Sequence, residues 1–203
     1  MHLYLLFLVV AAVTVLSPGP GVVMTLTNAL RFGVRGTFGG ILGIAFGALI
    51  VAAISATSVG VLLATSAVAF TTLKLLGAAY LIYLGIKLWR SPGINIIEQT
   101  AQDTSFSKRF IEGPSLQLTN PKAVFFFISI FPQFIDLQSN YSVQFSILVA
   151  TYIVLVLGIH SLYALFAKRA KQWFTSERGG RVLNKTASAT FVAFGVALAS
   201  AQK

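Results

Sequence analysis

The sequence SPGPG at residues 17–21 places two prolines and two glycines within five positions of an otherwise apolar segment. Proline lacks a backbone N–H and clashes with the carbonyl group one turn earlier, so this density predicts that a helix unwinds here. A second interruption, TNPK, occurs at residues 119–122 of another apolar segment. Both interruptions fall near the middle of segments long enough to cross a bilayer, and they decide how the rest of the chain is interpreted.

The composition around these breaks is typical of a membrane protein. Of 203 residues, 56% are apolar and 10% are charged, and the mean hydropathy is +0.83, whereas about 25% of a soluble domain is charged. The absence of cysteine excludes a disulfide framework, a thiolate metal site and a cysteine nucleophile. The net charge of +10 does not form a basic patch interleaved with aromatic residues, so no nucleic-acid partner is expected.

Six apolar segments reach the length of roughly 20 residues that a spanning helix needs. They cover roughly residues 3–30, 36–63, 71–89, 110–137, 141–167 and 183–200. The first segment lacks the basic start and the cleavage site of a signal peptide, so it is expected to be a retained helix. The predicted fold is an all-α, multi-pass membrane protein in which residues 1–203 form a single transporter domain.

The lysine and arginine residues are concentrated in every other predicted connection. Twelve of the fifteen lie in the first, third and fifth connections, whereas the even connections and both termini hold only Lys203. Lys74 and Lys122 lie within predicted spans. Because cytoplasmic loops carry the excess of basic residues, both termini are predicted to lie outside and the odd connections in the cytoplasm.

The chain divides into two halves of three helices, about 1–93 and 105–203, which must enter the membrane in opposite orientations because three is odd. Each half opens with its interrupted helix. Breaks at corresponding positions of inverted repeats indicate a transporter binding site, and the half-helix N-termini favour an anionic group such as a carboxylate. The structural alternative is a pair of ordinary proline kinks.

Several stretches resemble the LysE/RhtB family of amino-acid exporters, with the homoserine/threonine exporter branch most similar. They are SPGPG at 17–21, FGVRGTFGGILGIAFG at 32–47, LKLLGAAYLIYLGIKLWRS at 73–91, LTNPKAVFFFISIFPQF at 118–134 and GVALAS at 195–200. The resemblance implies export of small amino acids or their analogues from the bacterial cytoplasm across the inner membrane, driven by protons. It implies no cofactor. It leaves the oligomeric state open, with a homo-oligomer as one alternative.

The chain departs from this family where many members carry an acidic residue. Gly21 occupies the position after the first break, and the apolar stretches 43–48 and 154–157 contain no carboxylate. The proton-coupling residue is therefore unassigned. A cationic substrate, which would favour an intramembrane carboxylate, is correspondingly disfavoured.

The predicted substrate site lies at the two breaks. Lys122 is the strongest candidate, with two equally weighted roles: binding a substrate carboxylate, or donating to carbonyl groups freed by the break. Asn120 and Thr119 are candidate caps of the second half-helix. The predicted substrate-binding residues are Ser17, Pro18, Gly19, Pro20, Gly21, Thr25, Tyr80, Thr119, Asn120, Pro121 and Lys122.

Other candidates favour structural roles. His160 is the only histidine within a predicted span. A role as a proton relay is one interpretation, but a buried structural side chain is favoured. The glycines at 36, 39, 40, 43 and 47 indicate close helix packing. The phenylalanines at 125–127, 131 and 134 are expected to be core or lipid-facing bulk.

Four functions remain as alternatives. The leading one is a secondary exporter, because no nucleotide-binding motif is present. A facilitator with the same broken helices, or an exporter of another small metabolite or ion, is the runner-up. A membrane enzyme would need convergent catalytic groups, and a metal exporter would need carboxylate, histidine or thiolate ligands; no catalytic or metal-binding residues are predicted.

Overall fold

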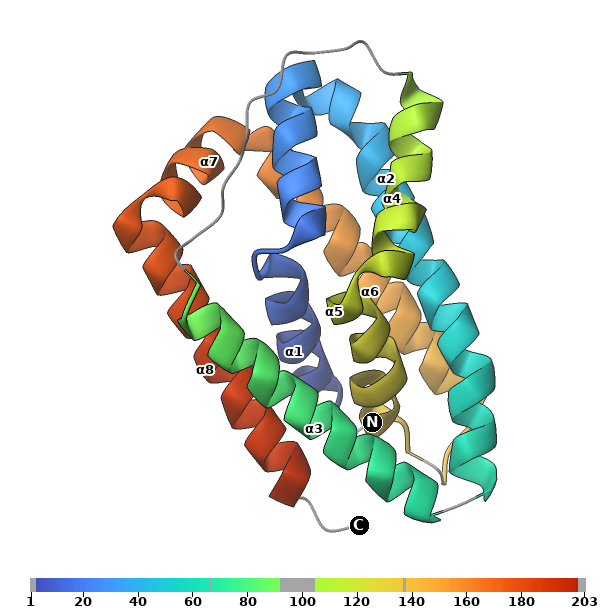
Figure 1. Ribbon diagram of the computed structural model, residues 1–203. Helices are drawn as coiled ribbons and strands as arrows, with labels where there is room; N and C mark the ends of the chain where they lie inside the picture. The colour runs from blue at the N-terminus through green and yellow to red at the C-terminus, as the bar shows by residue number, and fades with distance from the viewer. Residues whose placement is uncertain (1–2, 66, 92–104, 137, 201–203) are drawn as a thin grey trace.

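The structure is a computed structural model that describes residues 3–65, 67–91, 105–136 and 138–200. Within these residues the chain forms an elongated bundle of helices without strands (Figure 1). The all-α prediction is therefore confirmed. His2, Lys203 and the acidic residues Glu98 and Asp103 lie outside the described residues, as does the predicted boundary between the two halves.

Both predicted helix breaks are present. Helix α1 (Tyr4–Leu16) ends at Ser17, whose backbone is extended, and α2 (Pro20–Thr65) begins three residues later. Helix α4 (Phe106–Thr119) ends at Asn120, which is also extended, and α5 (Pro121–Phe125) follows. The helix then continues as a π-helical turn, η1 (Phe126–Ile130), and a 3-10 turn, η2 (Phe131–Phe134).

Helix α2 contains a sharp kink where the sequence predicts a connection between two spans. Gly33 has a φ of 69° and a ψ of −179°, while the residues on both sides are helical. A positive φ is costly for residues with a side chain and accessible to glycine. The expected connection around residues 31–35 is thus reduced to a single residue.

The remaining helices are α3 (Ala67–Trp89), α6 (Tyr141–Leu165), α7 (Ala167–Thr175) and α8 (Glu177–Ser200). Helix α7 and the start of α8 cover nearly all of the predicted basic connection 168–182, so that connection is largely helical. Among the described residues, three helices are long and apolar enough to cross a membrane: Pro20–Ala56, Tyr141–Leu165 and Arg178–Ser200. Tyr4–Leu16 and Pro121–Phe134 are shorter apolar helices.

Glycine brings α2 into close contact with α4. A Cβ atom built on Gly39 would lie 2.9 Å from the Phe106 carbonyl oxygen, and one on Gly47 would lie 2.7 Å from Pro114 Cα. A Cβ atom on Gly43 would collide with the Phe110 carbonyl oxygen. The predicted packing role of these glycines is confirmed, because a larger residue would force the two backbones apart.

Helices α3 and α8 lie side by side along one flank of the bundle (Figure 1). The Ser188 hydroxyl in α8 donates a hydrogen bond of 2.6 Å to the carbonyl oxygen of Gly85 in α3. Between this pair and α6, an aromatic core surrounds η1 and η2, in which Phe7 lies edge-on to Phe131 and Phe134, with ring centroids 5.7 and 5.3 Å apart.

The two ends of the bundle differ in character. Helix α1 begins and α8 ends at the lower end in Figure 1, where Leu3, Lys74 and Leu198 line one apolar cavity. At the other end, Asn184 Nδ2 donates to the Ser91 carbonyl oxygen at 3.2 Å. There too the Arg109 guanidinium carbon lies 4.7 Å from the centroid of the Phe32 ring.

Candidate functional site

Lys122 links the two helix breaks. Its ammonium group donates to the carbonyl oxygens of Thr14 at 2.9 Å and Ser17 at 3.0 Å, and to the Ser17 hydroxyl at 3.0 Å. An ammonium has three protons to donate, and these contacts account for all of them. Its position at the C-terminus of α1 is also electrostatically favourable, because a helix C-terminus carries partial negative charge.

The carbonyl groups at the end of α1 receive donors from several elements. The Ser17 amide donates to Val13 at 2.8 Å, and the Ser17 hydroxyl donates to Thr14 at 2.9 Å. From α6, the Tyr163 hydroxyl donates to the Leu16 carbonyl oxygen at 2.8 Å. Unpaired backbone groups in a bilayer cost several kcal/mol each, so these donors explain how the unwound turn is tolerated.

The second break is capped as the sequence predicts. Asn120 Oδ1 accepts a hydrogen bond of 3.1 Å from the Lys122 backbone N–H. This contact assigns the amide orientation and leaves Nδ2 as a donor. Thr119 instead faces outward and donates to the Ser115 carbonyl oxygen at 2.8 Å, so the structure leaves it outside the site.

A large cavity of about 540 Å³ lies beside both breaks. Its volume is within the range of about 300–1,000 Å³ that is typical of small-molecule sites. At its inner end it meets the first break and residues 120–122, and it then runs along α3 and α8. Its lining residues are Pro18, Gly19, Pro20, Val23, Tyr80, Tyr83, Leu84, Lys87, Leu88, Ser91, Asn120, Pro121, Lys122 and Phe191.

Tyr80 forms part of the aromatic wall of this large cavity. Its ring stacks on that of Phe125 with 4.1 Å between centroids, and the Tyr83 ring lies 6.1 Å away. Lys87 is placed over Tyr83, with its ammonium 5.9 Å from the ring centroid. Two tyrosine rings and a lysine therefore flank the route from the breaks toward Ser91.

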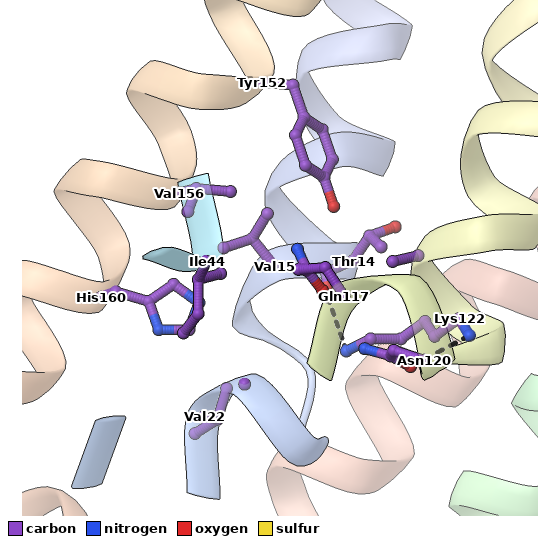
Figure 2. A pocket seen from close by; sticks show the side chains of 12 residues that line it. Thr14, Val15, Val22, Ile44, Gln117, Asn120, Lys122, Tyr152, Val156 and His160 are labelled. Atoms are coloured by element: carbon purple, nitrogen blue, oxygen red, sulfur yellow. Dashed lines mark hydrogen bonds between the residues drawn. The ribbon is translucent and has the colours of Figure 1, made fainter. Parts of the chain in front are cut away.

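A second, small cavity of about 30 Å³ lies between α1, α2, α5 and α6. It is large enough for about two water molecules. Figure 2 shows Tyr152, His160 and Gln117 around it, with Asn120 and Lys122 forming one wall. Asn120 and Lys122 line both cavities, so they separate the small cavity from the large one.

The predicted residues divide between these features. Pro18, Gly19, Pro20, Pro121 and Tyr80 line the large cavity. Gly21 lines the small one.

Two predicted hydroxyl residues contact the site indirectly. Ser17 is fully buried beneath the Lys122 ammonium. Thr25 is buried and bonds His160, with 2.7 Å between its hydroxyl oxygen and Nδ1.

Sequence reasoning missed three polar residues of the small cavity. Thr14, Gln117 and Tyr152 are buried around it and were not predicted as site residues. Gln117 could have been found, because a glutamine one turn before a break in an apolar span is unusual. Thr14 and Tyr152 carry no comparable signal.

The apolar helical bundle, with two unwound helix centres beside a large cavity, defines the class of membrane translocators. A family model described as LysE type translocator matches residues 12–202, and the chain belongs to this family. The predicted family is thus confirmed, and with it the prediction of a transporter rather than an enzyme.

Relatives match along nearly their whole length. A homoserine/homoserine lactone efflux protein of Salmonella typhi is 36% identical over 97% of this chain and 95% of its own. A leucine efflux protein of Salmonella choleraesuis is 32% identical over 98% of this chain and 95% of its own. An uncharacterized membrane protein of Vibrio cholerae is 32% identical over 100% of this chain and 98% of its own. No solved structure matches the chain.

Proposed function

We propose that the protein is a proton-coupled exporter of small neutral amino acids or their analogues. The observation that carries the proposal is the 540 Å³ cavity at the two helix breaks of a LysE family translocator. Relatives named for homoserine, homoserine lactone and leucine efflux support substrates of this class. A facilitator with the same cavity would move these substrates without a gradient.

Six spans arranged as two inverted repeats, each of three helices, form the proposed topology. Packing between the halves supports it, because the third helices, α3 and α8, pair with each other. The first helix of each half contacts the second helix of the other: Thr25 bonds His160, and Gly43 packs against Phe110. A two-fold relation between the halves requires such reciprocal pairs.

The orientation proposed for an inner membrane places both termini outside. The contacts of Asn184 with Ser91 and of Arg109 with Phe32 bring the first, third and fifth connections to one end. The excess of basic residues in these connections favours the cytoplasmic side. The large cavity extends from the breaks toward Lys87 and Ser91 at that end, so this arrangement faces the cytoplasm.

Neutral substrates are favoured because, among the described residues, no acidic side chain lines the large cavity. A substrate carboxylate would accept a hydrogen bond from Asn120 Nδ2. The substrate ammonium would face the rings of Tyr80 and Tyr83, where cation–π attraction is worth roughly 0.5–2 kcal/mol. A lysine or arginine side chain would place a second cation here without a carboxylate partner.

Efflux from proteoliposomes tests this function. Vesicles are loaded separately with labelled homoserine, leucine, lysine and arginine, with and without an imposed pH gradient. We expect saturable efflux of the neutral substrates that the gradient accelerates. Equal movement of lysine would contradict the assigned class, and saturable efflux that no gradient affects would indicate a facilitator.

A Tyr80→Ala variant tests the location of the site. It should raise the KM for efflux about two- to thirtyfold, the range that corresponds to roughly 0.5–2 kcal/mol of lost cation–π attraction. Phe38→Ala is the matched control, since Phe38 is 47% exposed and lines neither cavity described above. Equal effects of the two variants would refute the assignment.

A further inference from the structure

Polar side-chain atoms with no hydrogen-bond partner among the described residues line the small cavity. The Nε2 atom of His160, the Tyr152 hydroxyl and the Gln117 amide are all in this condition. Their residues are 4%, 3% and 5% exposed, respectively. Polar groups in a protein interior are normally paired, with protein or with water, so three such groups around one water-sized space indicate that it receives a polar guest.

His160 is the titratable group best placed to receive a proton there. Its Nδ1 is fixed by the Thr25 hydroxyl at 2.7 Å, and the other edge of the ring faces Gly21, where a Cβ atom would lie 3.4 Å from Cε1. When Nδ1 carries the hydrogen and donates it to Thr25, Nε2 is the basic nitrogen and faces the cavity. Imidazole is the side chain that ordinarily titrates near neutral pH.

The two carboxylates whose side chains the structure describes offer no alternative carrier near this cavity. Glu112 and Asp136 are both exposed, and neither lines the small cavity. The other titratable groups facing His160 are Tyr152, Lys122 and Tyr163, whose ring centroid lies 6.2 Å from that of His160. Lys122 already holds three acceptors, and the Tyr163 hydroxyl donates to Leu16.

We propose that the small cavity is the proton-binding chamber of this exporter and that His160 Nε2 is the atom that carries the proton. The chamber is distinct from the substrate cavity, from which Asn120 and Lys122 separate it. A polar path continues toward the basic end through Thr25 and Asn28, one turn further along α2; the Asn28 side-chain nitrogen is buried without a partner. This inference rests on the proposed export function and names its coupling residue.

The chamber also explains how a proton would act on the helix break. A protonated His160 and the Lys122 ammonium are like charges that line the same small space, and they repel each other. Protonation of His160 therefore opposes the arrangement in which Lys122 is bound to α1. Deprotonation toward the cytoplasm restores that arrangement, which is the one seen here.

The test compares His160→Asn with wild type in the same proteoliposomes. Asparagine keeps a polar group in reach of Thr25 and cannot titrate. Two readouts are measured for labelled homoserine: exchange between equal concentrations on both sides, and net efflux with and without a pH gradient. An entrapped pH-sensitive dye records proton movement.

We expect the variant to retain exchange within about threefold of wild type and to lose at least nine-tenths of the acceleration by the pH gradient, together with the substrate-dependent proton signal. His160→Gln serves as the second variant if the first does not fold. Thr25→Val, which keeps the imidazole but removes its hydrogen-bond partner, should shift the pH at half-maximal net efflux. Thr190→Val, on the exposed face of α8, controls for loss of a membrane hydroxyl.

Intact gradient acceleration and proton signal in His160→Asn or His160→Gln would overturn the inference while leaving the export function in place. Acceleration of wild-type efflux by a sodium gradient instead of a proton gradient would also overturn it. Absence of any amino-acid movement in folded wild type would refute the export function itself, and the coupling role would fall with it.

Discussion

The bond network of Lys122 predicts a specific defect in Lys122→Met. Methionine replaces the aliphatic stem but donates nothing. The Thr14 carbonyl oxygen would keep the Ser17 hydroxyl as a donor, whereas the Ser17 carbonyl oxygen would lose the only donor that the structure gives it. The variant thus leaves one buried carbonyl unpaired.

An unpaired buried carbonyl costs about 1–3 kcal/mol. Removing a buried ammonium recovers part of its desolvation cost, so this range is an upper estimate. A change of this size shifts the equilibrium between bound and released α1 by about 5- to 150-fold. If the cycle passes through the bound arrangement, the maximal efflux rate should fall by a comparable factor.

The assay is the initial efflux rate from proteoliposomes as a function of internal substrate concentration. We expect Lys122→Met to lower the maximal rate severalfold, by at most about 150-fold, and to change KM less than threefold, because the ammonium protons are engaged by α1. Lys122→Arg should fall between wild type and methionine, since a planar guanidinium cannot reproduce the three donor directions. A raised KM with an unchanged maximal rate would refute this reasoning and assign Lys122 to the substrate carboxylate.

Three further variants probe the same architecture. Gly19→Ala should slow efflux by several-fold, because its Cβ atom would lie 3.0 Å from the Lys122 ammonium nitrogen; Gly158→Ala is the control, since a Cβ atom there meets nothing within 4 Å. Gly113→Ala should lower stability by about 1–3 kcal/mol because its Cβ atom would collide with the backbone of α2, which a reduced monodisperse fraction after heating in detergent would report. Ser188→Ala removes the 2.6 Å bond to Gly85 and should lower stability by about 0.5–1.5 kcal/mol in the same heating assay; an unchanged melting curve would show that the pairing of α3 and α8 does not depend on it.

The local consequences of proline and glycine could be predicted from the sequence. The breaks at 17–21 and around Asn120 follow from chemistry within a few residues, as does the capping by Asn120. The close packing at Gly43 could also be predicted, because small residues at helical spacing serve that purpose on many backbones.

The long-range pairings could not be predicted in the same way. The Lys122 ammonium bonds residues 105 and 108 positions earlier in the chain, and Thr25 meets His160 across 135 positions. Only the packing of α5 and α6 around the first break brings these groups together. Two roles for Lys122 therefore remained equal from the sequence, whereas its contacts in the structure are those of a cap.

The contacts of Lys122 also have a genetic consequence. Two of its three acceptors are main-chain carbonyl oxygens, at Thr14 and Ser17, and every amino acid supplies a main-chain carbonyl. Substitution of Thr14 or Ser17 can therefore remove at most one acceptor, the Ser17 hydroxyl. Substitution of Lys122 removes the donor of all three hydrogen bonds. Replacement of Thr14 or Ser17 by another small residue should therefore be tolerated better than any replacement of Lys122.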